Sequence, residues 1–311
     1  MGILVGTCSW TDRTLLATQF YPKYASTAEA RLRYYSQNFN LVEVDSTYYS
    51  MLAERTAGLW CRRTPDNFTF DVKAFSLFTQ HPTQVQSLPK DIQSALGKTN
   101  IQGSRLYYRD LPFEIRNELW GRFSQALLPL DSAGKLGVVL FQFPQWFYPR
   151  EDNREYIIQC QQRLPQYRLA IEFRNGDWLS DREKDHTLSL LSDNNLAYVS
   201  VDEPQGFTSS VPPVAEPTSD IGVVRFHGRN KENWEKKGIT VAERFKYLYS
   251  EDELKEWLPK LGGLASQTKQ LHVLFNNCHG DYGIRNARDM AGLIRSQPAL
   301  FPDLAEAEKK E

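Results

Sequence analysis

The chain has 311 residues, and its 37 Lys and Arg against 38 Asp and Glu give a formal net charge of −1. This balance excludes a generally basic nucleic-acid-binding protein, so any contact with nucleic acid must come from a local patch. Hydrophobic residues make up 41% of the chain, enough for a core, and no long apolar run predicts a membrane span. The four cysteines lack C-x-x-C spacing and indicate reduced thiols, so we expect a cytoplasmic protein without membrane contact.

Short runs rich in β-forming residues recur along the chain, and most are followed by a helical pattern. Such alternation is typical of α/β proteins, and eight parallel strands predict a closed, TIM-type (β/α)8 barrel. We expect a single barrel domain over residues 1–311. The predicted strands are Ile3–Cys8, Leu41–Ser46, Phe68–Ala74, Leu136–Phe143, Arg168–Arg174, Leu196–Asp202, Ile221–His227 and Gln270–Asn276.

Two connections are expected to differ from a single helix. The third carries an insertion at about 75–135, in which an irregular excursion (84–110) crosses the barrel mouth before a helix from Pro112 to Pro129. The sixth, at 203–220, is rich in proline and predicts an extended, non-helical loop. The charged tail after Pro302 is expected to fray. Capping-box spacing predicts helix starts at Ser26/Glu29, Asp152/Glu155, Ser180/Glu183 and Ser250/Glu253.

Within the strands, side chains alternate between an apolar face and a polar face. We expect the apolar face under the helices and the polar face inside the barrel, with its last residues at the carboxyl-end mouth, where such barrels place their sites. Glu43 and Glu172 should then lie within salt-bridge reach of Lys73, Arg174 or Arg225. The alternative is an ionic core that only closes the barrel. The polar positions at the mouth are Asp45, Lys73, Gln142, Arg174, Asp202, His227 and Asn276, and those one pleat deeper are Glu43, Asp71, Glu172, Ser200 and Arg225.

A set of ordered motifs resembles the YecE-like family, also known as domain of unknown function seventy-two. The motifs are Gly6–Trp10, Val42–Tyr49, Phe70–Ala74, Thr79–His81, Phe141–Pro144, Glu172–Trp178, Arg225–Arg229, Phe275–Asn277 and Asn286–Ala287. The resemblance covers nearly the whole chain and implies a TIM-type barrel, but it implies no activity. The chain departs from the family pattern at Cys8, where a serine is common, and in its long third loop.

The polar side chains could support general acid/base chemistry. The catalytic candidates are Glu43, Asp45, Lys73, Glu172 and His227. A carboxylate would act as the base and Lys73 or His227 as the acid. A metal site built from Glu43, Glu172, Asp202 and His227 is arithmetically possible, but neighbouring arginines would repel the cation, so we predict no metal and no cofactor. Cys8 is either a nucleophile or, more often for such a position, a small buried thiol.

Two classes of function remain open. The first is an enzyme, of hydrolase or isomerase type, that acts on a phosphorylated or nucleic-acid substrate; the second is a non-catalytic barrel that binds nucleic acid, a metabolite or a protein. The substrate-binding candidates are Arg174, Asp202, Arg225, Arg229, Asn276, Gln142 and Trp10.

Three loops carry more specific expectations. Ser104–Asp110 and Arg229–Lys237 mix cations with aromatic rings, which suits stacking on bases, although ordinary loop packing is the alternative. The loops after the seventh and eighth strands predict an anion site that uses Arg229 and Asn276, while Asn277 ties down a neighbouring loop. His81, just before Pro82, either hangs over the mouth or is a turn residue.

Overall fold

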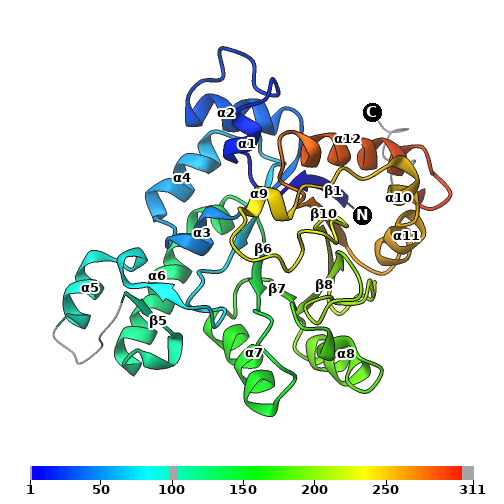
Figure 1. The fold of residues 1–311 in the computed structure, drawn as a ribbon. Helices are drawn as coiled ribbons and strands as arrows, with labels where there is room; N and C mark the ends of the chain where they lie inside the picture. Colours follow the sequence, from blue (N-terminus) through cyan, green and yellow to red (C-terminus); the bar gives the residue numbers. More distant parts are fainter. Residues whose placement is uncertain (1, 98–103, 303–311) are drawn as a thin grey trace.

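The computed structural model describes residues 2–97 and 104–302. Eight parallel strands close into a barrel in the order β1-β10-β9-β8-β7-β6-β3-β2 (Figure 1). Each strand of the barrel therefore pairs with the strands before and after it along the chain, which confirms the predicted TIM-type (β/α)8 barrel. The strands are β1 (Gly2–Thr7), β2 (Leu41–Val44), β3 (Thr69–Lys73), β6 (Leu136–Gln142), β7 (Leu169–Glu172), β8 (Ala197–Asp202), β9 (Ile221–Phe226) and β10 (Gln270–Phe275), with a separate antiparallel pair, β4 (Thr83–Gln84) and β5 (Arg105–Leu106).

Alternation along the strands sends two kinds of side chain in opposite directions. The ring of Phe226 packs on Phe275, with centroids 4.7 Å apart, and on Trp257 at the start of α11, so this face lies beneath the helices. Arg225, one residue earlier, instead meets Glu43 of β2 inside the barrel. The predicted division into an apolar outer face and a charged inner face is confirmed for these strands.

Helices ring the barrel, and α9 with its flanking loop lies in front of the barrel centre in Figure 1. That loop follows β9 and so belongs to the carboxyl-end face. The helices are α1 (Arg13–Leu16), α2 (Ala28–Ser36), α3 (Ser46–Tyr49), α4 (Glu54–Arg62), η1 (Val85–Ser87), α5 (Lys90–Leu96), η2 (Tyr108–Asp110), α6 (Phe113–Ser132), α7 (Glu151–Arg163), η3 (Gly176–Leu179), α8 (Lys184–Asp193), α9 (Val241–Arg244), α10 (Glu251–Lys255), α11 (Leu258–Ala265) and α12 (Tyr282–Arg295).

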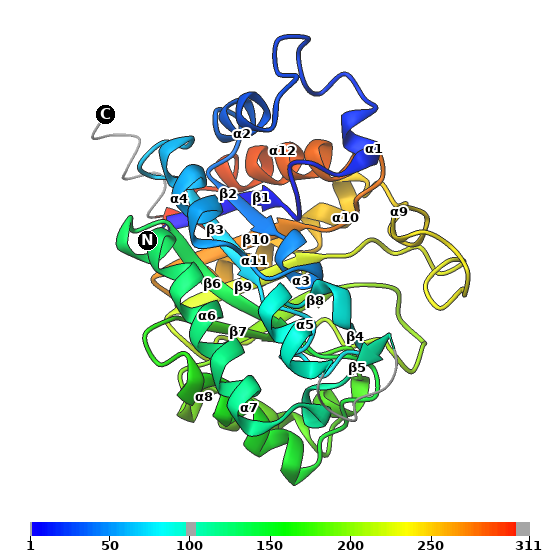
Figure 2. The same ribbon diagram turned by 90° about the vertical axis from the view of Figure 1, so that its left-hand side faces the viewer.

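The insertion between β3 and β6 is more regular than predicted. Residues 84–110 were expected to be irregular, but they contain α5 and, with Thr83, the paired strands β4 and β5. Helix α6 continues through Pro129 instead of ending there. Figure 2 shows β4 and β5 on the side of the barrel that also carries α1 and α9, so the insertion adds to the wall around the barrel mouth.

The remaining predictions on connections have mixed outcomes. The capping box at Ser250 and Glu253 is confirmed, whereas Thr27 caps α2 one residue later than predicted, and α7 and α8 also begin away from their predicted caps. Residues 203–220, all of them described, form no helix, as expected. The predicted charged tail after Pro302 lies outside the described residues. In the described ranges, no helix combines the length and apolar character needed to cross a membrane.

Candidate functional site

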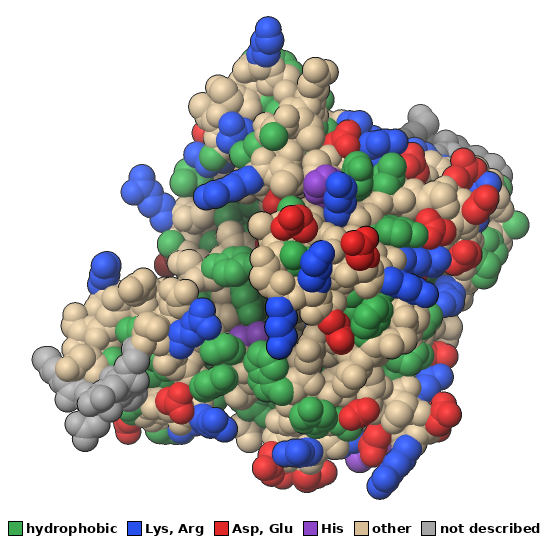
Figure 3. All heavy atoms as spheres, in the orientation of Figure 1, with side chains coloured by type: hydrophobic (Ala, Val, Ile, Leu, Met, Phe, Trp, Pro, Cys, Tyr) green, Lys and Arg blue, Asp and Glu red, His purple; other side chains and the backbone are tan. Residues whose placement is uncertain are grey.

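A pocket of about 720 Å³ opens among the loops at the carboxyl ends of the strands. Figure 3 shows a hollow on this face, with hydrophobic side chains and a histidine inside it and Lys or Arg side chains at its edge. We call this cavity the main pocket. It is lined by Asp45, Tyr48, Tyr49, Lys73, His81, Gln142, Pro144, Gln145, Trp146, Arg174, Thr208, Ser209, Trp234, Glu235, Lys236, Lys237, Val241, Arg244, Phe245 and Asn276.

The predicted site residues divide into two layers. Asp45, Lys73, Gln142, Arg174 and Asn276 line the main pocket, as the strand alternation predicted for the mouth. The other four inward-facing candidates are almost fully buried and form a charged cluster below the pocket. They are Glu43, Glu172, Arg225 and His227.

Arg225 of β9 is the centre of the charged cluster, and its side chain is fully buried. It donates to both carboxylate oxygens of Glu43, at 2.8 Å from Nε and 2.6 Å from Nη2, and to Glu172 from Nη1. Gln142 Oε1 lies 3.4 Å from Nη1 and Cys8 Sγ lies 3.6 Å from Nη2. Buried charges are stable only when each is paired with an opposite charge and hydrogen-bonded, and Arg225 meets this requirement for both acids. The predicted salt bridges of Glu43 and Glu172 are therefore confirmed.

The acids of the cluster differ in protonation because their partners differ. Burial acts against ionisation of Glu172, yet the guanidinium groups of Arg174 and Arg225 hold its pKa well below the ordinary value. Burial raises the pKa of Glu43 to about 8, even though Arg225 opposes this shift. Burial, helped by the charge of Arg174, lowers the pKa of His227 well below its usual value, so its imidazole is neutral. Glu172 is therefore the anion that fixes both arginines.

Arg174 connects the charged cluster to the main pocket. Its Nε lies 2.6 Å from Glu172 Oε1, and its Nη1 donates to Glu203 Oε2 at 2.9 Å. The guanidinium also lies over the Trp234 ring, 5.6 Å from the ring centroid. Glu203 in turn accepts from the backbone N–H of Val211 at 2.7 Å. Sequence reasoning missed Glu203, because it stands just beyond the predicted strand, where alternation no longer indicates direction.

The stability of the protein should depend on the protonation of Glu203. Burial raises its pKa to about 8 against the opposing effect of Arg174, so the folded chain binds this proton more tightly than the unfolded chain. Its contribution is complete below the ordinary pKa of about 4.5 and is lost as the pH rises toward 8. Glu203→Gln should therefore flatten the pH dependence of the unfolding free energy, by at most about 1.4 kcal/mol per pH unit.

Urea unfolding at a series of pH values measures this effect. Glu216→Gln, an exposed glutamate on the same proline-rich connection, is the matched control and should leave the profile as it is. A Glu203→Gln profile parallel to that of the wild type would contradict a raised pKa at this site.

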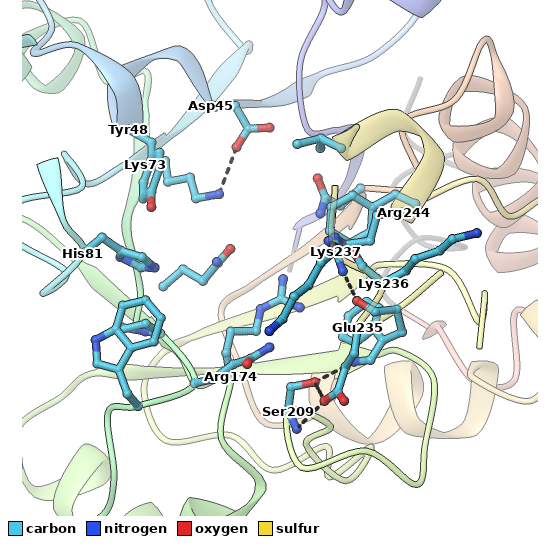
Figure 4. Close-up of a pocket in the computed structure, with 18 of the residues that line it drawn as sticks. Asp45, Tyr48, Lys73, His81, Arg174, Ser209, Glu235, Lys236, Lys237 and Arg244 are labelled. Atoms are coloured by element: carbon cyan, nitrogen blue, oxygen red, sulfur yellow. Dashed lines mark hydrogen bonds and ion pairs between the residues drawn. The ribbon is translucent and has the colours of Figure 1, made fainter. Parts of the chain in front are cut away.

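Asp45 and Lys73 form an ion pair at the wall of the main pocket. Lys73 Nζ lies 3.3 Å from Asp45 Oδ1 and 5.2 Å from the centroid of the Tyr48 ring, and Figure 4 shows all three side chains on one side of the cavity. Burial acts to lower the pKa of Lys73, but Asp45 together with Glu43 and Glu172 outweighs this effect and raises the pKa above the ordinary value. Lys73 is therefore an ammonium at physiological pH and can stabilise negative charge or donate a proton.

His81 supplies the complementary proton acceptor. Its Nδ1 lies 2.9 Å from Thr79 Oγ1, whose hydroxyl donates to the Ser76 carbonyl at 3.1 Å. The hydroxyl oxygen therefore accepts the Nδ1 proton, which leaves Nε2 with a free lone pair. Burial, with the charge of Lys73, lowers the pKa of His81 to about 4, so the ring is neutral. Of the two expectations for His81, the position at the mouth is confirmed.

The loop after β9 brings two further cations to the opposite side of the pocket. Lys236 and Lys237 are exposed, and neither lies in an ion pair with any acid of residues 2–97 and 104–302. The guanidinium of Arg244 in α9 donates to backbone carbonyls of this loop, including that of Lys236 at 2.8 Å, and so holds the loop in place. Figure 4 shows Lys237 and Arg244 on the far side of the cavity from Lys73 and His81, with the Lys237 side chain pointing into the cavity and the Lys236 side chain pointing away from it.

His227 was expected at the mouth but lies in the buried charged cluster. Three further candidate residues are not where the sequence placed them. Asp202 was expected at the mouth, but its carboxylate accepts from Tyr249 and Trp257, both at 2.6 Å, on the helix side of the barrel. Arg229 turns to the same carboxylate, 2.8 Å away, because a buried acid needs a cationic partner. Trp10 packs edge-on against the Trp60 ring, 5.5 Å away, in the outer aromatic layer. None of the three lines the main pocket in the described structure.

These corrections change the predicted anion site between the seventh and eighth strands. Asn276 reaches the pocket, and its Nδ2 lies 2.9 Å from His227 Nδ1. Asn277 points away and donates to the Tyr247 carbonyl at 2.8 Å, so its predicted role in tying down a neighbouring loop is confirmed. Arg229, however, is held by acids, whereas Lys236 and Lys237 of the same loop form no ion pair with a described acid.

Sequence reasoning also missed the aromatic wall of the main pocket. Trp146 and Tyr49 are large and exposed, at 51% and 63%, and Tyr48 contacts the His81 ring with centroids 5.3 Å apart. Trp146 lies in the loop that follows β6, and the carboxyl ends of barrel strands are where binding residues gather, so its position was a signal that could have been used. The wall offers flat apolar surface beside positive charge.

Neither a metal ion nor a reactive thiol is needed to explain the cluster. Within the described ranges, no group of three or more His, Cys, Asp or Glu side chains is placed to hold a metal ion. The guanidinium of Arg225 fills the space between Glu43 and Glu172 that a cation would take. Cys8 is fully buried, and burial raises the pKa of its thiol well above the ordinary value, so it is a packed thiol and no nucleophile.

A closed (β/α)8 barrel with a cationic, aromatic-lined pocket at its carboxyl end places this protein in the class of TIM-type barrel proteins. More narrowly, the chain belongs to the family described as protein of unknown function DUF72, whose family model matches residues 4–310. The resemblance to the YecE-like family that its motifs indicated is confirmed.

Similar proteins support the same assignment. The chain is 32% identical over 296 residues to UPF0759 protein YunF of Bacillus subtilis (strain 168), with 94% of each chain covered. The solved DUF72 family protein TM1631 of Thermotoga maritima MSB8 is 28% identical, with a TM-score of 0.74 over 95% of this chain and 100% of that chain. The DUF72 family protein EF0366 of Enterococcus faecalis V583 is 24% identical, with a TM-score of 0.75 over 94% and 95%. These names establish family and fold and leave the reaction to be inferred from the site.

Proposed function

We propose that this barrel is an acid/base enzyme that acts on a phosphorylated or nucleic-acid substrate in the main pocket. The observation that carries the proposal is the charge of the lining: five cationic side chains face two carboxylates. Lys73 and Arg174 have acidic partners, but Lys236 and Lys237 have none within the described residues. Free cations at the edge of a concave, aromatic-lined site favour an anionic ligand with a flat ring.

In this proposal, one side of the pocket binds phosphate and the other side transfers protons. Lys237 and Arg174 bind phosphate, because their N–H groups point into the cavity, and Lys236 adds positive charge at its edge. Lys73 donates a proton or stabilises developing negative charge, and the neutral His81 ring accepts a proton through Nε2. Such proton transfers belong to hydrolase and isomerase chemistry alike, and neither requires a cofactor.

The buried cluster acts through the residues that reach the pocket. Glu172 and Glu203 fix the guanidinium of Arg174 at 2.6 Å and 2.9 Å, and Arg225 fixes Glu172. Glu43 and Glu172 are thus positioning residues. Asn276 and Gln142 add amide groups to the pocket floor. The free cysteines fit the reducing cytoplasm, where phosphorylated substrates are made.

Replacing Lys236 and Lys237 together should weaken ligand binding. The double substitution Lys236→Gln/Lys237→Gln should raise the Kd for a nucleoside monophosphate about tenfold at low salt, because two exposed charges near a phosphate are removed. Titration calorimetry measures the change. Lys269→Gln, an exposed lysine at the amino end of β10, is the control and should leave the Kd as it is.

A substrate panel decides between an enzyme and a binding protein. Phosphomonoesters, phosphorylated sugars, nucleotides and abasic-site DNA should be tested for binding and for turnover. Binding without turnover would support the alternative, a non-catalytic barrel, whereas equal affinity of the double lysine variant and the wild type for every bound ligand would refute the phosphate role of the pocket.

A further inference from the structure

A second cavity of about 480 Å³, which we call the side cavity, adjoins the main pocket at Trp146. Trp146 lines both cavities, and Gln80 of the side cavity is followed directly by His81 of the main pocket. The two cavities are therefore consecutive parts of one groove, with Trp146 at their junction. The side cavity is lined by Gln80, Tyr107, Arg109, Trp146, Phe147, Arg150, Asp152 and Asn153.

The side cavity repeats the chemistry of the main pocket. Arg109 is 82% exposed, its nearest acid is Asp110 at 3.9 Å, and its guanidinium lies over the Tyr107 ring. Arg150 is also exposed, and no described acid forms an ion pair with it. Asp152 is the one carboxylate of the lining. Two cations beside exposed aromatic rings thus continue the positive charge of the groove past Trp146.

The junction between the cavities is held in a specific conformation. Gln80 has φ of +62°, which a non-glycine residue adopts at an energetic cost and which recurs at ligand sites. This turn directs His81 to the main pocket, where its ring packs edge-on against Trp146 with centroids 5.7 Å apart. The exposed half of the Trp146 ring is therefore positioned by its neighbours and needs little ordering to bind a flat ligand.

We propose that this groove binds a single-stranded nucleic acid across several nucleotides. One base stacks on Trp146, the phosphates on one side contact Lys236 and Lys237, and those on the other side contact Arg109 and Arg150. This inference rests on the proposed function of the main pocket and narrows its substrate class. A small phosphorylated metabolite occupies one cavity, whereas a strand carries a phosphate for each base and uses cations on both sides of a stacking ring.

A ladder of oligothymidylates tests the proposal. Fluorescence anisotropy at several salt concentrations should show affinity rising from the mononucleotide through the dinucleotide to the octanucleotide. Arg109→Ala/Arg150→Ala should raise the Kd of the octanucleotide at least about tenfold more than that of the mononucleotide, and should reduce the slope of log Kd against log salt by about 1.4. Trp146→Ala should weaken binding at every length, since base stacking is lost.

The matched control also removes two exposed arginines, but at positions outside the groove. Arg168→Ala/Arg295→Ala removes two exposed arginines at the amino end of β7 and the last turn of α12, away from the groove. This control should retain the affinity for the octanucleotide. Because Arg109, Arg150 and Trp146 are all exposed, loss of the fold does not obscure the result.

Each outcome separates this inference from the function on which it rests. If mononucleotide and octanucleotide bind equally and only Lys236→Gln/Lys237→Gln weakens them, the main pocket binds phosphate and the extended strand is refuted. If polyglutamate competes as well as the octanucleotide, the groove recognises charge without stacking, and the nucleic-acid assignment is refuted. If no phosphorylated ligand of any length binds, both proposals fail.

Discussion

Arg225→Met should lower the unfolding free energy by about 3–5 kcal/mol, the loss expected when one partner of a buried ion pair is removed. The side chain is fully buried and holds both Glu43 and Glu172. Without it, the ionised Glu172 keeps Arg174 as its partner but loses the other guanidinium. The pKa of Glu43, already raised by burial, should rise further.

Urea unfolding at two pH values measures this loss and its cause. The pKa of Glu43 is about 8 in the wild type and should be higher still in the variant, so both folded forms hold this proton at pH 5 to 7. The deficit should therefore be constant over that range and should grow as the pH rises above 8, where only the wild type gives up the proton. Arg122→Met is the control, because Arg122 pairs with Asp91 and Glu118 at the surface and should change stability by less than about 1 kcal/mol. If Arg225→Met also lowered the unfolding free energy by less than about 1 kcal/mol at every pH, the cluster would not depend on its central cation.

The strand pattern predicted the barrel and the deeper charged layer because the period of a strand is fixed. Once Glu43, Glu172 and Arg225 are assigned to the inner face, neighbouring parallel strands bring them together without any knowledge of the loops. The same reasoning placed Asp45, Lys73, Gln142 and Arg174 at the pocket, since each lies within two residues of the end of a strand. Local periodicity therefore accounts for the part of the site that belongs to the strands.

The pattern failed at the end of β8. Asp202 is the last residue of β8 and turns to Tyr249 and Trp257, while Glu203 takes the expected inward place beside Arg174. Such a change of direction depends on contacts with residues about fifty positions away, which alternation does not encode. The helix caps failed for a similar reason, because several polar residues near a helix start can each accept the first free N–H group.

The loops contribute the residues that the sequence predicted least well. Lys236 and Lys237 were part of a segment that mixed cations with aromatic rings, but their direction is set by Arg244, which binds the carbonyls of that segment. Arg229 belongs to the same segment and was expected to bind a ligand for the same reason, but it pairs with Asp202 instead. Composition identifies a loop as a candidate, and tertiary hydrogen bonds decide which of its cations are free to bind a ligand.

The two layers of the site also explain why so much buried charge is retained. An ionic core alone would be no more stable than a well-packed apolar one. Here Arg174 extends from that core into the pocket, and its Nε and Nη1 are each held by a buried acid. In the proposed function, a guanidinium fixed in this way would lose little freedom on binding an anion, and the cluster would add to ligand affinity through preorganisation.

Lys73→Met should reduce turnover of a substrate found with the panel by about 10²–10⁴-fold, the range expected when a general acid is removed. Asp45→Asn should have an effect of the same sign, because Asp45 keeps Lys73 protonated and oriented at 3.3 Å. The double substitution Asp45→Asn/Lys73→Met removes the pair as a unit, so it should fold as well as either single variant without recovering activity.

Lys73→Arg separates the charge of this side chain from its proton. Arginine keeps the positive charge but does not release a proton, since its pKa lies above about 12. If Lys73 is the acid, Lys73→Arg should keep a KM within about threefold of the wild type while kcat falls nearly as far as in Lys73→Met, because ground-state binding is retained and proton transfer is lost. Steady-state kinetics on the purified variants give both constants. Turnover of Lys73→Arg at the wild-type rate would instead assign Lys73 to charge stabilisation, and the proton donor would have to be sought elsewhere in the pocket.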